Sequence, residues 1–260
     1  MKRFFTAALA TAALVFGFAE ARADSFTDII KKGVVRIAVP LDVPPFGSIN
    51  QDRKPEGFDI DFAEMVGKAL GVKVELQQVT GANRIPYLLT DKVDIVISVM
   101  GLTPERARQI MFTAPYADTN LAVFGPKSAN VKSAADLGNL KVVAAKGTTQ
   151  DLGLTEMNPR ANIMRTEDDA TAATAYLTGQ ADLFATNSLI IPDLLKRAPN
   201  KEFDLKFLIR RSPAHMGVKM GEFGLLQWLN SFIFFNTMNG ELDRLHRKWL
   251  AMPMIPLPTL

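Results

Sequence analysis

The chain has 260 residues, with 30 Lys and Arg against 27 Asp and Glu, and it contains no cysteine. The lack of cysteine excludes disulfides, thiolate metal sites and cysteine nucleophiles, and a chain of this length buries enough surface to fold without such cross-links. The two histidines, His215 and His246, are too far apart for an H-x-x-x-H metal motif. No serine lies in a G-x-S-x-G elbow, so no enzymatic motif stands out.

The first 23 residues predict an export signal. Lys2 and Arg3 precede an apolar run over residues 4–18, and residues 21–23 (Ala-Arg-Ala) form the small-x-small pattern that a signal peptidase recognises. The run is too short to anchor in a bilayer core of about 30 Å, which needs about 20 residues. A buried N-terminal helix is the alternative. We expect cleavage after Ala23 and a periplasmic protein.

The predicted export signal (residues 1–23, the leader) also accounts for most of the excess positive charge of the chain. It carries three basic residues and one acidic residue, which leaves 27 basic against 26 acidic residues in the rest of the chain. No run of Lys and Arg with interleaved aromatic residues remains. We therefore exclude nucleic acid and the membrane surface as partners.

After the leader, short β-branched runs alternate with amphipathic stretches. The pattern predicts strands over residues 34–39, 72–79 and 93–99, and helices over residues 58–70 and 83–89. This strand–helix–strand order is typical of an α/β sheet with mostly parallel neighbours.

The alternation then starts again. Expected strands cover residues 121–124, 141–145, 182–185 and 203–209, and expected helices cover residues 133–137, 168–178, 189–196, 221–238 and 240–251. Two α/β units predict two lobes with a cleft between them. Strand ends and helix N-termini meet in such a cleft, and the free N–H groups of the helices attract anions.

Short segments spread along the chain carry a resemblance to a known family. They are residues 44–46 (PPF), 57–61 (GFDID), 83–86 (NRIP), 93–95 (VDI), 103–106 (TPER), 112–116 (FTAPY), 141–144 (KVVA), 147–149 (GTT) and 247–250 (RKWL). Each segment is weak alone, but the ordered set resembles the polar-amino-acid-binding proteins of ABC importers, bacterial extracellular solute-binding protein family 3. The NRIP segment and the Pro-rich tail are closest to the glutamate/aspartate-type branch.

The resemblance implies a two-lobed periplasmic-binding-protein-like α/β fold (type II), in which a two-strand hinge lets the lobes close on a ligand. Lobe 1 would comprise residues 24–115 and 217–260, and lobe 2 residues 121–211. The crossings would lie near residues 116–120 and 212–216. It further implies a monomer that delivers a small carboxylated solute to a membrane permease, without cofactor or metal.

Arg106 is the main candidate for holding the carboxylate of the solute, because a guanidinium grips a carboxylate in a fork. The alternative interpretation of Arg106 is a solvated side chain that pairs with Glu105. The resemblance adds the Gly101 N–H group and the Val99 carbonyl beside it.

Thr148 and Thr149 form a candidate anion cradle at the start of a helix. Ordinary N-capping is the alternative, and one residue can do both. Lys146, just before this turn, either assists the cradle or is simply exposed.

Three further residues have two interpretations each. Phe58 is either an apolar wall for the solute or plain core. Arg84 resembles the residue that meets a side-chain carboxylate in acidic-amino-acid binders, or it is a surface arginine. Asp169 lies where that branch has a histidine, so it either faces the far end of the ligand or is a solvated acid at a helix start.

The chain departs from the family pattern where an amino acid's ammonium is bound. Asn187 and Gly101 replace an aspartate and a Ser or Thr, Val43 replaces a stacking aromatic, and Pro40 replaces a charged residue that tunes side-chain preference. A buried ammonium without a counter-charge costs several kcal/mol. A carboxylate without a free α-ammonium, or with a substituted nitrogen, therefore fits at least as well as an ordinary amino acid.

We expect a binding protein rather than an enzyme. The enzymatic alternative on the same fold is a periplasmic cyclohexadienyl dehydratase that acts on prephenate or arogenate. It would need a positioned acid, for which Asp169 is the one loose candidate. A third interpretation is the input module of a sensor.

Overall fold

The computed structural model describes residues 25–259. The predicted leader, with its cleavage site after Ala23, lies outside this range. Among the described residues, no helix combines the length and the apolar character that a membrane span requires.

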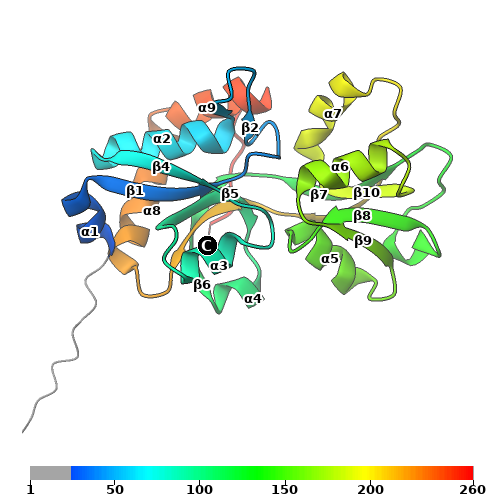
Figure 1. Ribbon diagram of the computed structural model, residues 1–260, viewed down its shortest axis with the longest axis horizontal. Coiled ribbons are helices and arrows are strands. Elements are labelled where there is room, and N and C mark those ends of the chain that lie inside the picture. The colour runs from blue at the N-terminus through cyan, green and yellow to red at the C-terminus, as the bar shows by residue number, and fades with distance from the viewer. Residues whose placement is uncertain (1–24, 260) are drawn as a thin grey trace, which may run out of the picture.

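The chain forms two α/β lobes that lie side by side (Figure 1). The sheet of lobe 1 has five strands in the order β4 (Lys73–Gln78), β1 (Val34–Val39), β5 (Ile95–Gly101), β12 (Ala214–Lys219) and β6 (Ile110–Ala117). β1 runs parallel to both of its neighbours, whereas β12 is antiparallel to β5 and β6. The central strands are apolar and buried because helices cover both faces of the sheet.

The covering elements of lobe 1 come from both ends of the chain. They are α1 (Ser25–Lys32), α2 (Phe58–Leu70), α3 (Arg84–Leu89), α4 (Pro104–Ala107), α8 (Phe223–Met238), α9 (Glu241–Leu250) and the small hairpin of β2 (Ser48–Ile49) and β3 (Pro55–Glu56). Phe46, Phe58, Phe62 and Tyr116 form the centre of the main core, and all four are fully buried. An aromatic cluster of this size supplies much of the burial energy of the lobe.

Lobe 2 repeats the design in a separate sheet. Its strand order is β11 (Asp204–Arg211), β7 (Asn120–Gly125), β10 (Leu183–Asn187), β8 (Lys141–Ala145) and β9 (Asn162–Thr166). Its helical elements are η1 (Ala134–Leu137), α5 (Thr149–Met157), α6 (Asp169–Leu177), η2 (Ser188–Ile190) and α7 (Ile191–Arg197). α6 and α7 cover one face and α5 covers the other, and each face has its own apolar cluster.

The chain passes between the two sheets twice, between β6 and β7 and again between β11 and β12. The two crossings are bonded to each other. The Thr119 hydroxyl donates to the Ser212 carbonyl over 2.6 Å, and the Ser212 N–H donates to the Thr119 carbonyl over 2.7 Å. The Arg211 guanidinium also pairs with Asp118 over 2.7 Å. These bonds keep the crossings together, as a two-stranded connection requires.

Several element bounds match the prediction and others do not. The strands over 34–39 and 141–145 and the helix over 58–70 have the predicted bounds. Three longer strands were not predicted: β12, an inner strand of the lobe 1 sheet, and β6 and β9, which lie at the edges of their sheets. β6 contains Pro115 and β9 is mostly half-exposed, so neither shows the continuous apolar run of a central strand.

Candidate functional site

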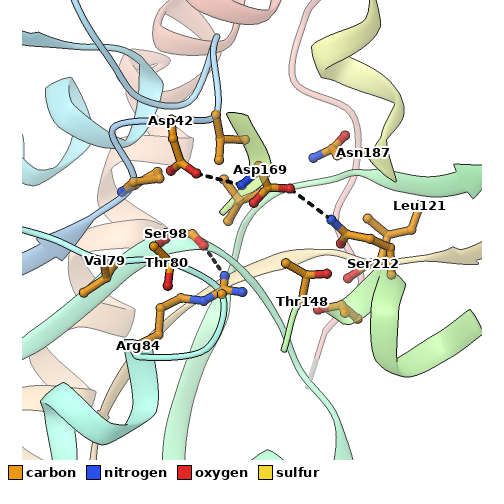
Figure 2. A pocket seen from close by; sticks show the side chains of 16 residues that line it. Asp42, Val79, Thr80, Arg84, Ser98, Leu121, Thr148, Asp169, Asn187 and Ser212 are labelled. Atoms are coloured by element: carbon orange, nitrogen blue, oxygen red, sulfur yellow. Dashed lines mark hydrogen bonds between the residues drawn. The ribbon is translucent and has the colours of Figure 1, made fainter. Parts of the chain in front are cut away.

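A polar cavity of about 500 Å³ of empty space, part of it open to solvent, lies between the lobes. The carboxyl ends of β1, β5 and β10 and the N-termini of α5 and α6 meet around it, as expected for a cleft between α/β units. Its polar and charged lining residues are Asp42, Thr80, Arg84, Ser98, Thr148, Thr149, Gln150, Asp169, Asn187 and Ser212 (Figure 2).

Arg106 is buried at the junction of the lobes, directly behind Thr149 and not on the cavity wall itself. Its guanidinium donates to the Gly101 carbonyl of lobe 1 over 2.6 Å. It also donates to lobe 2, to the Thr149 hydroxyl and the Gly147 carbonyl, both over 2.9 Å. Burial lowers the pKa of Arg106 to about 9, so the side chain stays charged at neutral pH. A solvated arginine is thus excluded, and the charge links both lobes.

Gly101 lies against lobe 2 with no room for a side chain. A Cβ atom at this position would lie 2.3 Å from the Ser212 hydroxyl and 2.8 Å from the Thr149 hydroxyl. A larger residue at this position would force the Ser212 and Thr149 side chains to move.

Thr148 and Thr149 begin helix α5 in lobe 2. The Thr148 hydroxyl accepts from the Asp151 N–H over 3.3 Å and donates to the Ala145 carbonyl over 2.7 Å. Thr148 is therefore an N-cap and also lines the cavity, and its part in an anion cradle stays a prediction. Lys146 is exposed and is not part of the lining.

Arg84 is buried against the cavity and does not lie on the protein surface. Its Nη1 donates to the Ser98 carbonyl over 2.5 Å, and its Nε has no partner. Burial lowers its pKa, while the negative charges of Asp169 and Asp42 act in the opposite direction. Arg84 is thus the one cation that lines the cavity within residues 25–259.

Two carboxylates from different lobes meet on the other side of the cavity (Figure 2). Asp42 Oδ2, in the loop after β1, accepts from the Asp169 N–H at the start of α6 over 2.9 Å. Asp42 Oδ1 is buried without a partner, and Asp169 Oδ1 accepts from the Gln150 amide over 3.3 Å.

Both carboxyl groups are harder to ionise than an exposed acid. Burial raises the pKa of Asp169 to about 7, and the charge of Asp42 contributes in the same direction. Burial also raises the pKa of Asp42, although the bond from the Asp169 N–H opposes this shift. Asp42 was not predicted as a site residue, because an acid in a Pro-rich turn has no sequence pattern that marks it.

Val99 lines the cavity in a left-handed conformation, with φ of 43°. Its N–H donates to Asp59 Oδ2 over 2.9 Å and to the Tyr116 hydroxyl over 3.1 Å, and that hydroxyl donates to Asp59 Oδ1 over 2.9 Å. Burial raises the pKa of Asp59 to about 7. This network, which the sequence analysis also missed, fixes a conformation that a β-branched residue rarely adopts.

Asn187 lies at the end of β10, and its side chain is buried at the cavity. Its Oδ1 accepts from the Leu189 N–H over 2.9 Å, and its Nδ2 has no partner. The group that this residue offers to the cavity is a neutral N–H donor.

Phe58 does not reach the cavity. It packs in the core of lobe 1 against Phe46, Phe62, Tyr116 and His246, and the His246 ring lies 4.9 Å away. The structure therefore places Phe58 in the core and not on a solute wall, because the first turn of α2 faces the sheet.

Residues 35–252 match the family of bacterial extracellular solute-binding proteins, family 3. The chain belongs to this family. It is 29% identical over 236 residues to the ABC transporter glutamine-binding protein GlnH of Bacillus subtilis, covering 89% of this chain and 86% of the relative.

Solved structures agree on the fold. An ancestral amino acid-binding protein, described as a precursor of cyclohexadienyl dehydratase, superposes with a TM-score of 0.79 at 32% identity, over 87% of this chain and 99% of that one. The solute receptor for L-cysteine of Neisseria gonorrhoeae gives 0.82 at 30% identity, over 87% and 93%. This solute-binding protein therefore has the two-lobed fold, while its place in the glutamate/aspartate-type branch stays a prediction.

Replacing Phe58 tests its position in the core. Phe58→Ala should lower the free energy of unfolding by about 3–5 kcal/mol, because it leaves a large cavity in the core. Solute affinity should change little. Urea unfolding and calorimetry measure the two quantities, and Phe223→Ala, at an exposed position of α8, is the control. A loss of affinity without a loss of stability would show that Phe58 contacts the solute.

Proposed function

We propose that this protein is the periplasmic solute-binding subunit of an ABC importer, which captures a small carboxylated solute by closure of its lobes and delivers it to a membrane permease. The solute is an amino acid or a derivative of one. Relatives named as ABC transporter glutamine-binding, L-cystine-binding and arginine-binding proteins support this proposal. The protein acts as a monomer.

The observation that carries the proposal is the position of the Arg106 charge, buried between the lobes and bonded to both. In the closed arrangement its lobe 2 acceptors are a hydroxyl and a carbonyl. A carboxylate is a stronger acceptor than either, because charge-assisted hydrogen bonds are about twice as strong as neutral ones. When the lobes separate slightly, the carboxylate of a solute can take the place of these acceptors.

The other partners of this carboxylate would come from both lobes. Lobe 1 provides the Gly101 N–H, and lobe 2 provides Thr148, Thr149 and the N-terminus of the nine-residue helix α5, which favours negative charge. Closure would then exclude water and strengthen each of these bonds. Binding and closure become one event, as a delivery subunit requires.

Removing the Arg106 charge tests this proposal. After a thermal-shift screen of amino acids, their derivatives and plain carboxylic acids has identified a solute, Arg106→Ala should weaken its binding by about 2–5 kcal/mol. Calorimetry measures the affinity, and the exposed neighbour Arg108 provides the control variant Arg108→Ala. If the affinity for Arg106→Ala equals that of the wild type, the proposed carboxylate site is wrong.

Asn187 tests whether the absence of a negative charge sets the choice of solute. A carboxylate at position 187 could still accept from the Leu189 N–H and would add a counter-charge for an α-ammonium. Asn187→Asp should therefore raise the affinity for ordinary α-amino acids by about tenfold or more. Asn187→Ala, which adds no charge, should show no gain. Equal affinities of the wild type and Asn187→Asp would show that the ammonium does not bind here.

Two observations favour the dehydratase alternative: the Asp169 carboxyl group with a pKa of about 7 in the cavity, and the likeness to the ancestral precursor of cyclohexadienyl dehydratase. Such a carboxyl group could serve as a general acid near neutral pH. We propose binding without turnover and expect no absorbance change when the protein is incubated with prephenate or arogenate. Product formation that Asp169→Asn abolishes would establish the enzyme instead.

A further inference from the structure

We propose that Asp42 and Asp169 form a cation subsite, and that the solute is a carboxylic acid that carries an amino or guanidino group away from its carboxylate. The inference rests on the proposed function, because it takes the carboxylate of the solute to be bound at Arg106. It adds the chemical class of the rest of the solute.

The two acids come together only because the lobes close. Asp42 belongs to lobe 1 and Asp169 to lobe 2, and the bond from the Asp169 N–H to Asp42 Oδ2 joins residues 127 positions apart. Both side chains line the cavity (Figure 2). Asp42 Oδ1 is buried and accepts no hydrogen bond, which leaves an acceptor available to a donor on a ligand.

Two other buried groups at the same cavity also lack partners. Arg84 and Asn187 are 6% and 5% exposed, and Arg84 Nε and Asn187 Nδ2 are donors without acceptors. Buried polar atoms in native proteins are nearly always paired. One unpaired acceptor and two unpaired donors around one cavity therefore point to a polar ligand that both donates and accepts hydrogen bonds.

The charges on the wall favour a cation on that ligand. Asp42, Asp169 and Arg84 are the charged residues among those that line the cavity, which gives one net negative charge when all three are ionised. Within residues 25–259, Arg84 forms no ion pair with either acid, since its Nη1 binds the Ser98 carbonyl. A ligand ammonium or guanidinium would neutralise this excess and supply donors to Asp42 Oδ1.

The same charges disfavour two other classes of solute. A dicarboxylate would bring its second negative charge close to Asp42 and Asp169, and like charges repel strongly in a partly buried site. An α-amino acid with an apolar side chain would leave these acids without a counter-charge, and its own ammonium would meet the neutral Asn187 amide. Asp42 and Asp169 therefore favour a distal cation over a second carboxylate or an apolar side chain.

The subsite should also link binding to protons. The groups that face Asp169 are Asp42 from the loop after β1, the preceding Asp168, Arg84 from α3 and the Gln150 amide from α5. With a pKa of about 7, Asp169 is largely protonated at pH 6 and largely ionised at pH 8. A ligand cation prefers the ionised form, so binding releases a proton and the affinity rises between pH 6 and pH 8.

Calorimetry with matched solutes tests the inference. We would compare L-lysine, δ-aminovalerate and γ-guanidinobutyrate with L-norleucine, valerate and butyrate, which lack the distal cation, and include glutarate as a dicarboxylate. At least one solute with the distal cation should bind about tenfold or more tightly than its counterpart without that group. Asp42→Asn and Asp169→Asn should each remove this preference, whereas Asp52→Asn, at an exposed position outside the cavity, should keep it.

The pH series adds a second readout that a purely structural role would not change. The affinity of the wild type for its best cationic acid should rise from pH 6 to pH 8, and Asp169→Asn should lose this dependence. Equal or tighter binding of glutarate or of the acids that lack the distal cation would overturn the cation subsite and leave the proposed function intact. If no carboxylated solute binds at all, the proposed function fails together with the inference.

Discussion

The closed arrangement depends on one buried cation. A guanidinium removed from water needs acceptors, since an unpaired buried charge costs several kcal/mol. Arg106 meets this requirement with the Gly101 carbonyl in its own lobe and with Gly147 and Thr149 in the other lobe. When the lobes open, the lobe 2 acceptors are lost, and we propose that the carboxylate of the solute replaces them. The same constraint thus links lobe closure to the charge of the cargo.

Several surrounding residues shape the contact between the lobes. Gly101 provides the space in which lobe 2 approaches lobe 1, and the bonds between Thr119 and Ser212 keep the two crossings together during the movement. Asp59 and Tyr116 hold Val99 in its left-handed conformation from within the core. These residues therefore fix the backbone geometry around the cavity.

The sequence predicts local features of this protein better than features formed between its lobes. Periodicity located the buried strand over 34–39 and the helix over 58–70, since these patterns depend on near neighbours in the chain. The family resemblance, and not spacing, marked Arg106 and Arg84 as more than surface arginines. Asp42 could not be predicted, because its role arises only where a loop of lobe 1 meets the start of α6 in lobe 2. Phe58 had two interpretations because an aromatic residue at a helix start does not reveal which way that turn faces.

A crystal structure of the protein with its tightest-binding solute tests the central claim most directly. The account predicts closed lobes, with the carboxylate of the solute within hydrogen-bonding distance of the Arg106 guanidinium and of Thr149. It would be contradicted if Arg106 kept its bonds to Gly147 and Thr149 while the carboxylate was bound elsewhere, for example by Arg84 alone.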